Sequence, residues 1–419
     1  MKLKFPLFLF IILSVLSCQS SLQKNAKSNL LLKDMRENSI KTYSVLDSTE
    51  IVKLNMIDKV IKVSSLLDIN KIIYLDSASL IGVIDKVIYS NDMFFVMDQA
   101  KSEKISCFNK EGKFLFNAGS KGRGPKEYLA LYDMTINPYQ QELLVYDGKR
   151  VLYFDLKGNF LKKRRIDLFG KNLSVMDNRG TLLFCMGNTI YNDDLKYNLI
   201  AVDTNNTVKS MNLPFRERET QLNEKLVPLF FFDHNYTNTY YTESYNDTIY
   251  EINENSIWPK YIMDYQQYSM PEKDKGKSAS ERRSKNPKSI DHMTVTIQND
   301  STLFVLNSGF FNHFIFTFYN KKSKASKSFS EVANDILGPA VQIFPIGIFE
   351  DKYFIIPVEP SIIHMIYKEG ILKKLNKEQI KEFNQSEETK TFREILNRTN
   401  ENSNPVLLIA KIKNQFYEQ

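Results

Sequence analysis

The sequence lacks the motifs that usually mark a catalytic or metal site. It has 4 histidines in 419 residues, and none of them stands in an H-x-x-x-H or H-E-x-x-H spacing, which a zinc site on a helix requires. A G-x-S-x-G nucleophile turn, a P-loop and a G-x-G-x-x-G turn after a strand are also missing. Acidic residues are plentiful, but no pair of them can be assigned to acid–base catalysis. We therefore expect no catalytic residue, no metal ion and no cofactor.

A strong excess of one charge is missing as well. The 56 Lys and Arg residues against 49 Asp and Glu residues leave a net charge of +7, which is too mild to favour a nucleic-acid partner. Part of the excess falls in segment 271–290. Such a run is usually a solvated loop or a short helix, and the alternative is a basic patch for an anionic partner. Its basic residues are Lys273, Lys275, Lys277, Arg282, Arg283, Lys285 and Lys288.

An apolar run stands at the start of the chain. Basic residues precede the segment Phe5–Leu16, which is too short for a comfortable membrane span. Ser17 and Cys18 follow, and the whole resembles a bacterial lipoprotein signal peptide. We expect residues 1–17 to be removed, Cys18 to carry the lipid, and residues 18–55 to form a tether. The alternative is an ordinary secretory signal in which Cys18 is incidental.

The remaining chain contains a repeated pattern. An apolar pair runs into an Asn, an Asp or, once, a Lys, then into polar residues, often with Gly, and then into another apolar strand. The markers are Asn109, Asp155, Asp203, Asn253, Asn320 and Lys368, at spacings of 46, 48, 50, 67 and 48 residues. Asn, Asp and Gly tolerate the positive φ of hairpin turns, and a repeat of about 40–50 residues built of short strands is typical of β-propeller blades. The sequence therefore predicts an all-β fold over 56–413, a six-bladed β-propeller of four-stranded antiparallel blades.

Composition and the segments between the markers refine this prediction. The 29 Phe and 22 Tyr against 1 Trp suit a core made of strands. Cys107 and Cys185 fall in blades that do not touch, so we expect no disulfide between them and two small buried side chains. Residues 376–400 have helical periodicity and are expected to form an insertion. The strand after Asn404, or Ile72–Leu75, would complete a blade formed from both ends of the chain.

A string between the first two blades carries a family resemblance. The G-x-G-P-x-E-Y string Gly122–Tyr128 resembles the hallmark of a family of bacterial secreted six-bladed β-propeller lipoproteins, related in architecture to NHL-type propellers. Further matching stretches are Leu80–Ile88, Phe108–Leu115 and Asn404–Leu408. The resemblance covers about residues 60–413 and implies the propeller fold and a lipoprotein or periplasmic setting. It implies no catalytic residues.

The same string has a physical interpretation of its own. Gly122 and Gly124 are expected to take backbone angles that a side chain would forbid, and Pro125 fixes its own φ. These three residues predict a structural turn between blades. The alternative is a ligand-binding surface, for which the candidate residues are Arg123, Glu127 and Tyr128.

Two classes of function remain open. The first is a non-enzymatic binding or scaffold lipoprotein of the cell envelope, anchored by its lipid and facing the periplasm from the outer membrane. It would hold a glycan, a peptide or an envelope protein at the propeller face or channel mouth. The second is a propeller hydrolase or lactonase with carboxylates, with or without a divalent ion, in the central channel. Converging Asp, Glu, Asn or His side chains in the channel would favour the enzyme, and an aromatic, neutral rim would favour binding.

Overall fold

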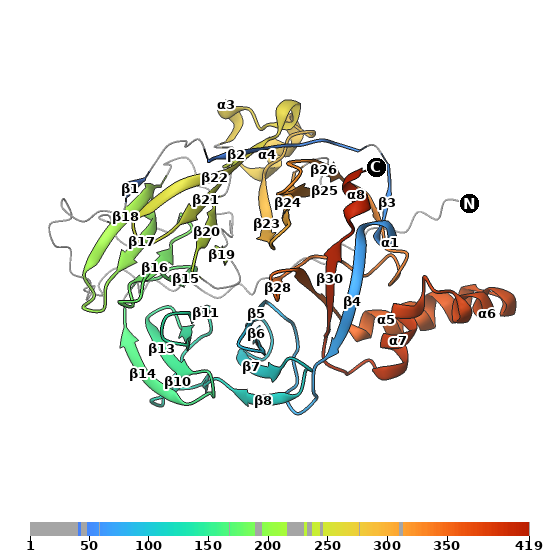
Figure 1. The fold of residues 1–419 in the computed structure, drawn as a ribbon, viewed down its shortest axis with the longest axis horizontal. Coiled ribbons are helices and arrows are strands. Elements are labelled where there is room, and N and C mark those ends of the chain that lie inside the picture. The colour runs from blue at the N-terminus through green and yellow to red at the C-terminus, as the bar shows by residue number, and fades with distance from the viewer. Residues whose placement is uncertain are drawn as a thin grey trace.

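The computed structural model describes residues 41–42, 48–57, 59–166, 168–188, 195–215, 230–232, 237–243, 246–275, 277–309 and 313–418. Within them, six sheets surround a common axis as the blades of a propeller (Figure 1). Each blade contains a four-stranded antiparallel meander, as the sequence predicts. None of the helices in these ranges has the length and the apolar composition of a membrane-spanning segment. Cys18 and the expected signal peptide lie outside the described residues.

Five blades are continuous in sequence. In blade 1 the strands are β5 (Lys86–Ser90), β6 (Met93–Asp98), β7 (Lys104–Asn109) and β8 (Phe114–Asn117). In blade 2 they are β11 (Asp133–Asn137), β12 (Glu142–Tyr146), β13 (Arg150–Asp155) and β14 (Phe160–Arg165). In blade 3 they are β15 (Asn172–Val175), β16 (Leu182–Cys185), β17 (Tyr197–Val202) and β18 (Val208–Pro214). In blade 4 they are β19 (Phe230–Phe232), β20 (Thr239–Thr242), β21 (Thr248–Ile252) and β22 (Ser256–Asp264). In blade 5 they are β23 (His292–Gln298), β24 (Thr302–Ser308), β25 (Phe314–Asn320) and β26 (Ser326–Phe329).

The sixth blade closes the ring with strands from both ends of the chain. Its strands are β28 (Gly347–Phe349), β29 (Tyr353–Val358), β30 (Val406–Ile412) and β4 (Leu67–Tyr74). The N-terminal β4 pairs antiparallel with the C-terminal β30, and Figure 1 shows the blue strand beside the red one. Both segments expected to complete a split blade therefore take part in it.

Apolar side chains fill the space between neighbouring blades. Successive side chains of a strand point to opposite faces, so each strand serves two interfaces. In β12, Leu144 and Tyr146 pack in the cluster between blades 2 and 3, while Leu143 and Val145 pack in the cluster between blades 1 and 2. Each fully buried side chain of this kind contributes about 1.5–3 kcal/mol. Cys107 and Cys185 lie in these layers, both free and buried, as expected.

Five of the six turn markers occupy equivalent positions. Each is the last residue of the third strand of its blade or directly follows that strand. Its side-chain oxygen accepts a hydrogen bond from the backbone N–H two residues later, as in an Asx turn. The five are Asn109, Asp155, Asp203, Asn253 and Asn320. The sixth assignment is wrong, because Lys368 lies in the π-helix η3 (Ile366–Leu372). In blade 6 the third and fourth strands come from opposite ends of the chain, so no turn joins them.

Further segments extend the blades at their edges and on one face. Between β29 and β30 the chain forms η3 and three α-helices, beginning earlier than the helical insertion that the sequence predicts. The helices are α5 (Pro360–Met365), α6 (Lys377–Gln385) and α7 (Lys390–Arg398). The segment between β22 and β23 contains η1 (Gln266–Tyr268), α3 (Glu272–Lys275) and α4 (Ala279–Lys285). The chain ends in α8 (Asn414–Glu418).

The N-terminal part runs along the outer strands. β1 (Lys41–Thr42) and β2 (Glu50–Lys53), which fall in the segment expected to be a tether, pair in parallel with the outer strand β22. β3 (Ile61–Lys62) then pairs with β27 (Val332–Ala333), and α1 (Val63–Leu66) leads into β4. This path covers part of the sheet edge that blade 4 would otherwise expose.

Candidate functional site

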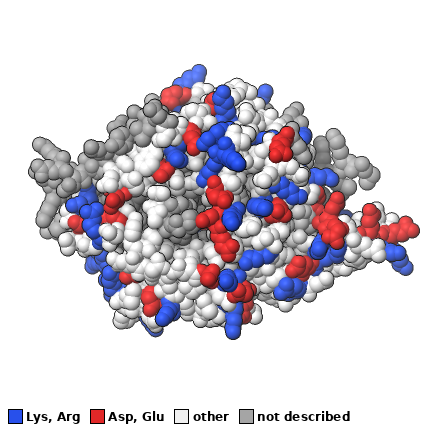
Figure 2. All heavy atoms as spheres, viewed as in Figure 1, with Lys and Arg blue, Asp and Glu red and all other residues white. Residues whose placement is uncertain are grey.

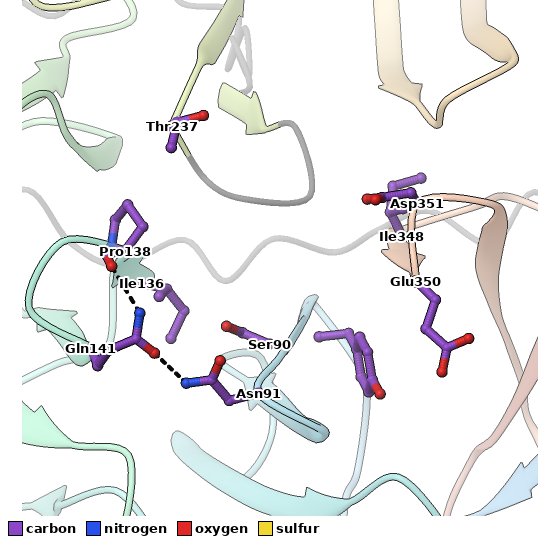
Figure 3. Close-up of a pocket in the computed structure, with 10 residues that line it drawn as sticks. Ser90, Asn91, Ile136, Pro138, Gln141, Thr237, Ile348, Glu350 and Asp351 are labelled. Atoms are coloured by element: carbon purple, nitrogen blue, oxygen red, sulfur yellow. Dashed lines mark hydrogen bonds between the residues drawn. The ribbon is translucent and has the colours of Figure 1, made fainter.

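A cavity of about 380 Å³ opens at one end of the central axis (Figure 3). Its walls come from blades 1, 2, 4 and 6, at or near the turns that join first to second strands. Blades 1 and 4 face each other across the ring, so the cavity lies at the channel mouth. The described residues that line it are Tyr89, Ser90, Asn91, Ile136, Pro138, Gln141, Thr237, Ile348, Glu350 and Asp351.

Two tight hairpin turns present much of this lining. Asn91 and Asp92 have φ of 51° and 57°, and Glu350 and Asp351 have φ of 45° and 60°. Positive φ at both central residues is the geometry of a type I′ turn, which matches the twist of the flanking strands. Asn and Asp adopt it readily, whereas other side chains do so at a cost of about 1–2 kcal/mol. Glu350 is therefore a costly choice for the blade 6 turn.

A hydrogen-bonded chain ties the rim of blade 1 to that of blade 2. The Asn91 Nδ2 group donates to the Gln141 Oε1 atom, and Gln141 Nε2 donates to the carbonyl of Pro138 at 2.8 Å. Gln141 itself has a φ of 55°. Two amide side chains are thus fixed at the edge of the cavity by contacts within the protein, which reduces the entropy cost of ordering them on a ligand.

Tyr89 supplies an aromatic wall and a neutral hydroxyl group. Its ring lies 4.3 Å from that of Phe349, centroid to centroid, and its hydroxyl donates to Asp92 Oδ1 at 2.9 Å. Burial, together with the Asp92, Glu350 and Glu111 carboxylates, raises the pKa of Tyr89 above its usual value. The phenol therefore stays protonated at neutral pH.

The lining meets only part of the pattern expected of an enzyme. Its carboxylates, Glu350 and Asp351, are consecutive residues of one turn, and the other polar groups are amides and hydroxyls. Among the described residues, no group of three or more His, Cys, Asp and Glu side chains is arranged to hold a metal ion. The rim is thus mainly neutral, with one aromatic side and one acidic side.

The string Gly122–Tyr128 lies on the opposite face, because it joins the last strand of blade 1 to the first strand of blade 2. Within it, β9 (Ser120–Lys121) pairs in parallel with β10 (Glu127–Tyr128). Glu127 Oε2 accepts a hydrogen bond from the Gly124 N–H at 2.6 Å, and a Cβ atom on Gly122 would lie 2.1 Å from the same oxygen. The glycines therefore allow a close approach of the Glu127 carboxylate.

The expected backbone reason for these glycines is wrong. Neither Gly122 nor Gly124 is among the glycines with positive φ, so an ordinary residue could adopt their backbone angles. The structural turn itself is present, with the Glu127 N–H donating to the carbonyl of Gly124 at 3.2 Å. Pro125 is exposed in this turn.

The three candidate ligand contacts of this string differ in their surroundings. Arg123 is exposed, and Glu127 is held by the loop as described above. Tyr128 is fully buried and donates its hydroxyl to the carbonyl of Glu103 at 2.9 Å. Burial, with a contribution from the Glu103 carboxylate, raises the pKa of Tyr128 to about 12. None of the three lines the axial cavity, and their role in ligand binding stays a prediction.

The sequence matches one family over most of its length. Residues 46–411 match a family described as a domain of unknown function (DUF4934). The chain belongs to the DUF4934 family. No curated protein matches it.

Many solved structures resemble this fold, and two of them illustrate the similarity. One is a candidate exported protein from Bacteroides fragilis, with 17% identity and a TM-score of 0.69 over 87% of this chain and 99% of the other. The second is a DUF4221 family member from Bacteroides vulgatus, with 11% identity and a TM-score of 0.50 over 83% and 98%. At these identities the similarity establishes the propeller fold, while the likeness to NHL-type propellers stays a prediction.

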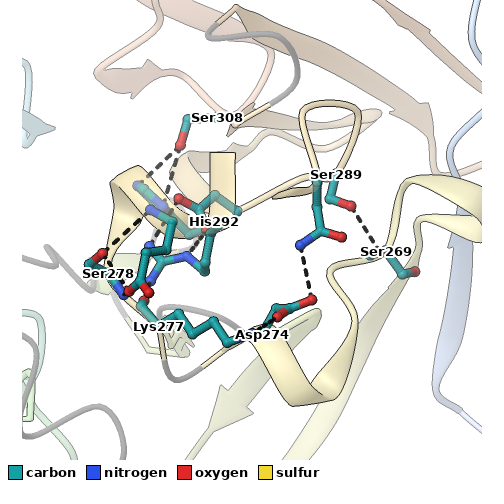
Figure 4. A network of polar contacts seen from close by, with 11 residues as sticks. Ser269, Asp274, Lys277, Ser278, Ser289, His292 and Ser308 are labelled. Atoms are coloured by element: carbon teal, nitrogen blue, oxygen red, sulfur yellow. Dashed lines mark hydrogen bonds and ion pairs between the residues drawn. The ribbon is translucent and has the colours of Figure 1, made fainter. Parts of the chain in front are cut away.

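Ion pairs neutralise part of the positive charge of the basic insertion 271–290 (Figure 4). Arg282 is fully buried and forms a bidentate ion pair with Asp291, at 2.5 Å from Nε to Oδ1 and 3.1 Å from Nη2 to Oδ2. Lys277 pairs with Asp274, which also accepts from Asn286 at 3.1 Å. The insertion thus contains two short helices, α3 and α4, with a polar network between them. Its exposed basic residues are Lys273, Arg283, Lys285 and Lys288.

Surface charge shows no dominant sign on the face seen in Figure 2. Acidic and basic side chains are interspersed over the blades and the helical insertion. A binding site defined by long-range attraction would need a field of one sign. The shape and local chemistry of the axial cavity are therefore the stronger guide to a ligand.

Sequence reasoning missed the residues of this cavity. Ser90-Asn91-Asp92 and Phe349-Glu350-Asp351 are recognisable as hairpin signals, because polar pairs separate apolar strands. Sequence periodicity does not show that the turns of blades 1, 2, 4 and 6 meet at one point. That arrangement follows from closure of the ring.

Proposed function

We propose that this chain is a non-enzymatic binding protein that holds a glycan in its axial cavity. The observation that carries the proposal is the cavity itself, whose volume of about 380 Å³ lies in the range of small-ligand sites, about 300–1,000 Å³. Hydroxyl and amide groups surround it, and Tyr89 forms one wall. A sugar presents both hydroxyls and apolar C–H surfaces, which suit such a lining.

The arrangement of carboxylates supports binding over hydrolysis. Glycoside hydrolysis uses two carboxyl groups that flank the bond to be broken. The two carboxylates of the cavity are neighbours in one turn, Glu350 and Asp351. A lining of fixed amides and hydroxyls is suited to orienting a ligand, since each hydrogen bond contributes about 0.5–1.5 kcal/mol.

Calorimetric titration of the full chain with a panel of oligosaccharides tests this proposal. Replacing Gln141 with alanine should weaken binding about tenfold, because it removes one rim amide and frees its partner Asn91. Gln140→Ala is the matched control, since Gln140 is exposed and does not line the cavity. No saccharide binding by the parent chain, or equal loss in both variants, would contradict the proposal.

We also propose that the protein is exported and held at the cell envelope by a lipid on Cys18, facing the periplasm. The N-terminal sequence supports this proposal, because a basic start is followed by the apolar segment Phe5–Leu16 and then by Ser17-Cys18. The structural relative from Bacteroides fragilis, a candidate exported protein, agrees with export. The first described strand, β1, lies on an outer edge, which suits a tether that approaches from the rim.

Substitution of Cys18 by serine tests the anchor. The variant should lose incorporation of labelled fatty acid and move from the membrane fraction to the soluble fraction, because the thioether-linked lipid can no longer form. Metabolic labelling followed by fractionation measures both properties. Continued labelling and membrane association of Cys18→Ser would contradict a lipid on this residue.

A further inference from the structure

The described lining of the axial cavity includes two carboxylates on one side. Glu350 and Asp351 are part of its described lining, and no Lys or Arg is among those lining residues. Figure 3 shows both side chains beside the turn of blade 6. A lining of this kind repels anionic ligands and favours ligands with a positive group.

Glu350 is the less constrained of the two carboxylates. It is exposed, and within the described ranges it forms no ion pair and accepts no hydrogen bond through its side chain. Its φ of 45° places a glutamate where the equivalent turn of blade 1 has Asn91. Asn or Gly would fit the turn at a lower conformational cost. Backbone strain kept at a cavity wall is consistent with a role for the side chain itself.

Tyr89 adds a second feature that suits a positive group. It lines the same cavity, and its neutral phenol donates a hydrogen bond to the Asp92 carboxylate at 2.9 Å. An ammonium group is attracted by the quadrupole of an aromatic ring and by the negative charge of a neighbouring carboxylate. Ser90, Asn91 and Thr237 provide neutral hydrogen-bonding groups nearby for the hydroxyls of the same ligand.

We infer that the ligand of the axial cavity is an amino sugar whose free ammonium group is bound by Glu350. The inference rests on the proposed function and narrows its ligand class. Glu350 would accept a charge-assisted hydrogen bond, and the rim amides and hydroxyls would contact the sugar hydroxyls. N-acetylation removes the positive charge, so the acetylated sugar should bind more weakly.

A matched pair of oligosaccharides tests the inference on the full chain. The tetramer of glucosamine should bind at least about tenfold tighter than the tetramer of N-acetylglucosamine, because a hydrogen bond to a charged group is stronger than one between neutral groups. Glu350→Gln should abolish most of this preference and leave thermal stability unchanged. Glu331→Gln is the matched control, since it removes one exposed carboxylate that lies outside the lining. Raising the salt concentration should reduce the preference of the parent chain.

The possible results separate the inference from the proposed function. Equal affinity for both tetramers, unaffected by Glu350→Gln but weakened by Gln141→Ala, would overturn the inference and leave glycan binding intact. No binding of either tetramer or of neutral oligosaccharides would overturn both. Glu350-dependent binding of a lysine-rich peptide, with no binding of amino sugars, would overturn the inference in favour of a peptide ligand.

Discussion

Replacing Gly112 with alanine is expected to lower the free energy of unfolding by about 2–5 kcal/mol. Gly112 has a φ of +86°, and a Cβ atom on it would lie 2.2 Å from the backbone oxygen of Tyr74. The substitution therefore combines an unfavourable backbone conformation, about 1–2 kcal/mol, with overpacking, about 1–3 kcal/mol. The substitution would also disturb the contact between blade 1 and the end of the closing strand β4. There the Asp76 N–H donates a hydrogen bond to the carbonyl of Gly112 at 2.9 Å.

Gly180→Ala separates the two contributions. Gly180 has nearly the same φ, +82°, but a Cβ atom there would meet only the Thr204 Cγ2 atom at 3.4 Å, an ordinary contact. The free energy of unfolding of Gly180→Ala should therefore fall by only about 1–2 kcal/mol. Urea denaturation of both variants measures the difference. Equal losses would show that the Gly112 turn does not press against the end of β4.

Arg282→Met is expected to have the largest effect of a single substitution on stability, about 3–5 kcal/mol. Asp291 is only 4% exposed and receives both of its side-chain ion-pair contacts from Arg282. Without the guanidinium group, a buried carboxylate remains without its charged partner. The loss should appear as a lower midpoint of urea denaturation.

Two further variants show whether the buried pair is the cause. Arg283→Met removes the adjacent exposed arginine and should change stability by no more than about 0.5 kcal/mol. The double variant Arg282→Met with Asp291→Leu should recover much of the loss, because an apolar pair of similar volume can replace a buried ion pair. An Arg282→Met chain as stable as the parent, or a double variant as unstable as the single one, would show that the unpaired Asp291 carboxylate does not cause the loss.

The repeat in the sequence was sufficient to predict the number and form of the blades. The turn chemistry of Asn109, Asp155, Asp203, Asn253 and Asn320 recurs because each of the five continuous blades needs the same tight connection between its third and fourth strands. Lys368 does not follow this rule. The closing blade takes β4 from the N-terminal part of the chain, so no turn connects its third and fourth strands and Lys368 lies in a helix instead.

The roles of some residues depend on side-chain contacts that the sequence pattern does not show. Gly122 and Gly124 have unexceptional backbone angles, and their lack of a side chain matters only because Glu127 folds back onto them. Arg282 stands in a run of basic residues that suggested a solvated face, yet Asp291 draws it into the interior. In both cases a partner a few residues away decides the role, and composition does not identify it.

The cavity depends on closure of the whole ring. Glu350 and Asn91 are more than two hundred residues apart in sequence, and both belong to short polar turns of a common type. Only the propeller geometry brings these turns to one axis. The candidate residues of the Gly122–Tyr128 string, by contrast, stood out because they form a distinctive local motif.

A crystal structure of the full chain bound to its tightest oligosaccharide would show whether the axial cavity is the glycan site. We expect the sugar to lie in the axial cavity, with its ring against Tyr89 and its polar groups within hydrogen-bonding distance of Gln141 and Glu350. A sugar bound instead on the opposite face, beside Arg123 and the Gly122–Tyr128 string, would contradict it.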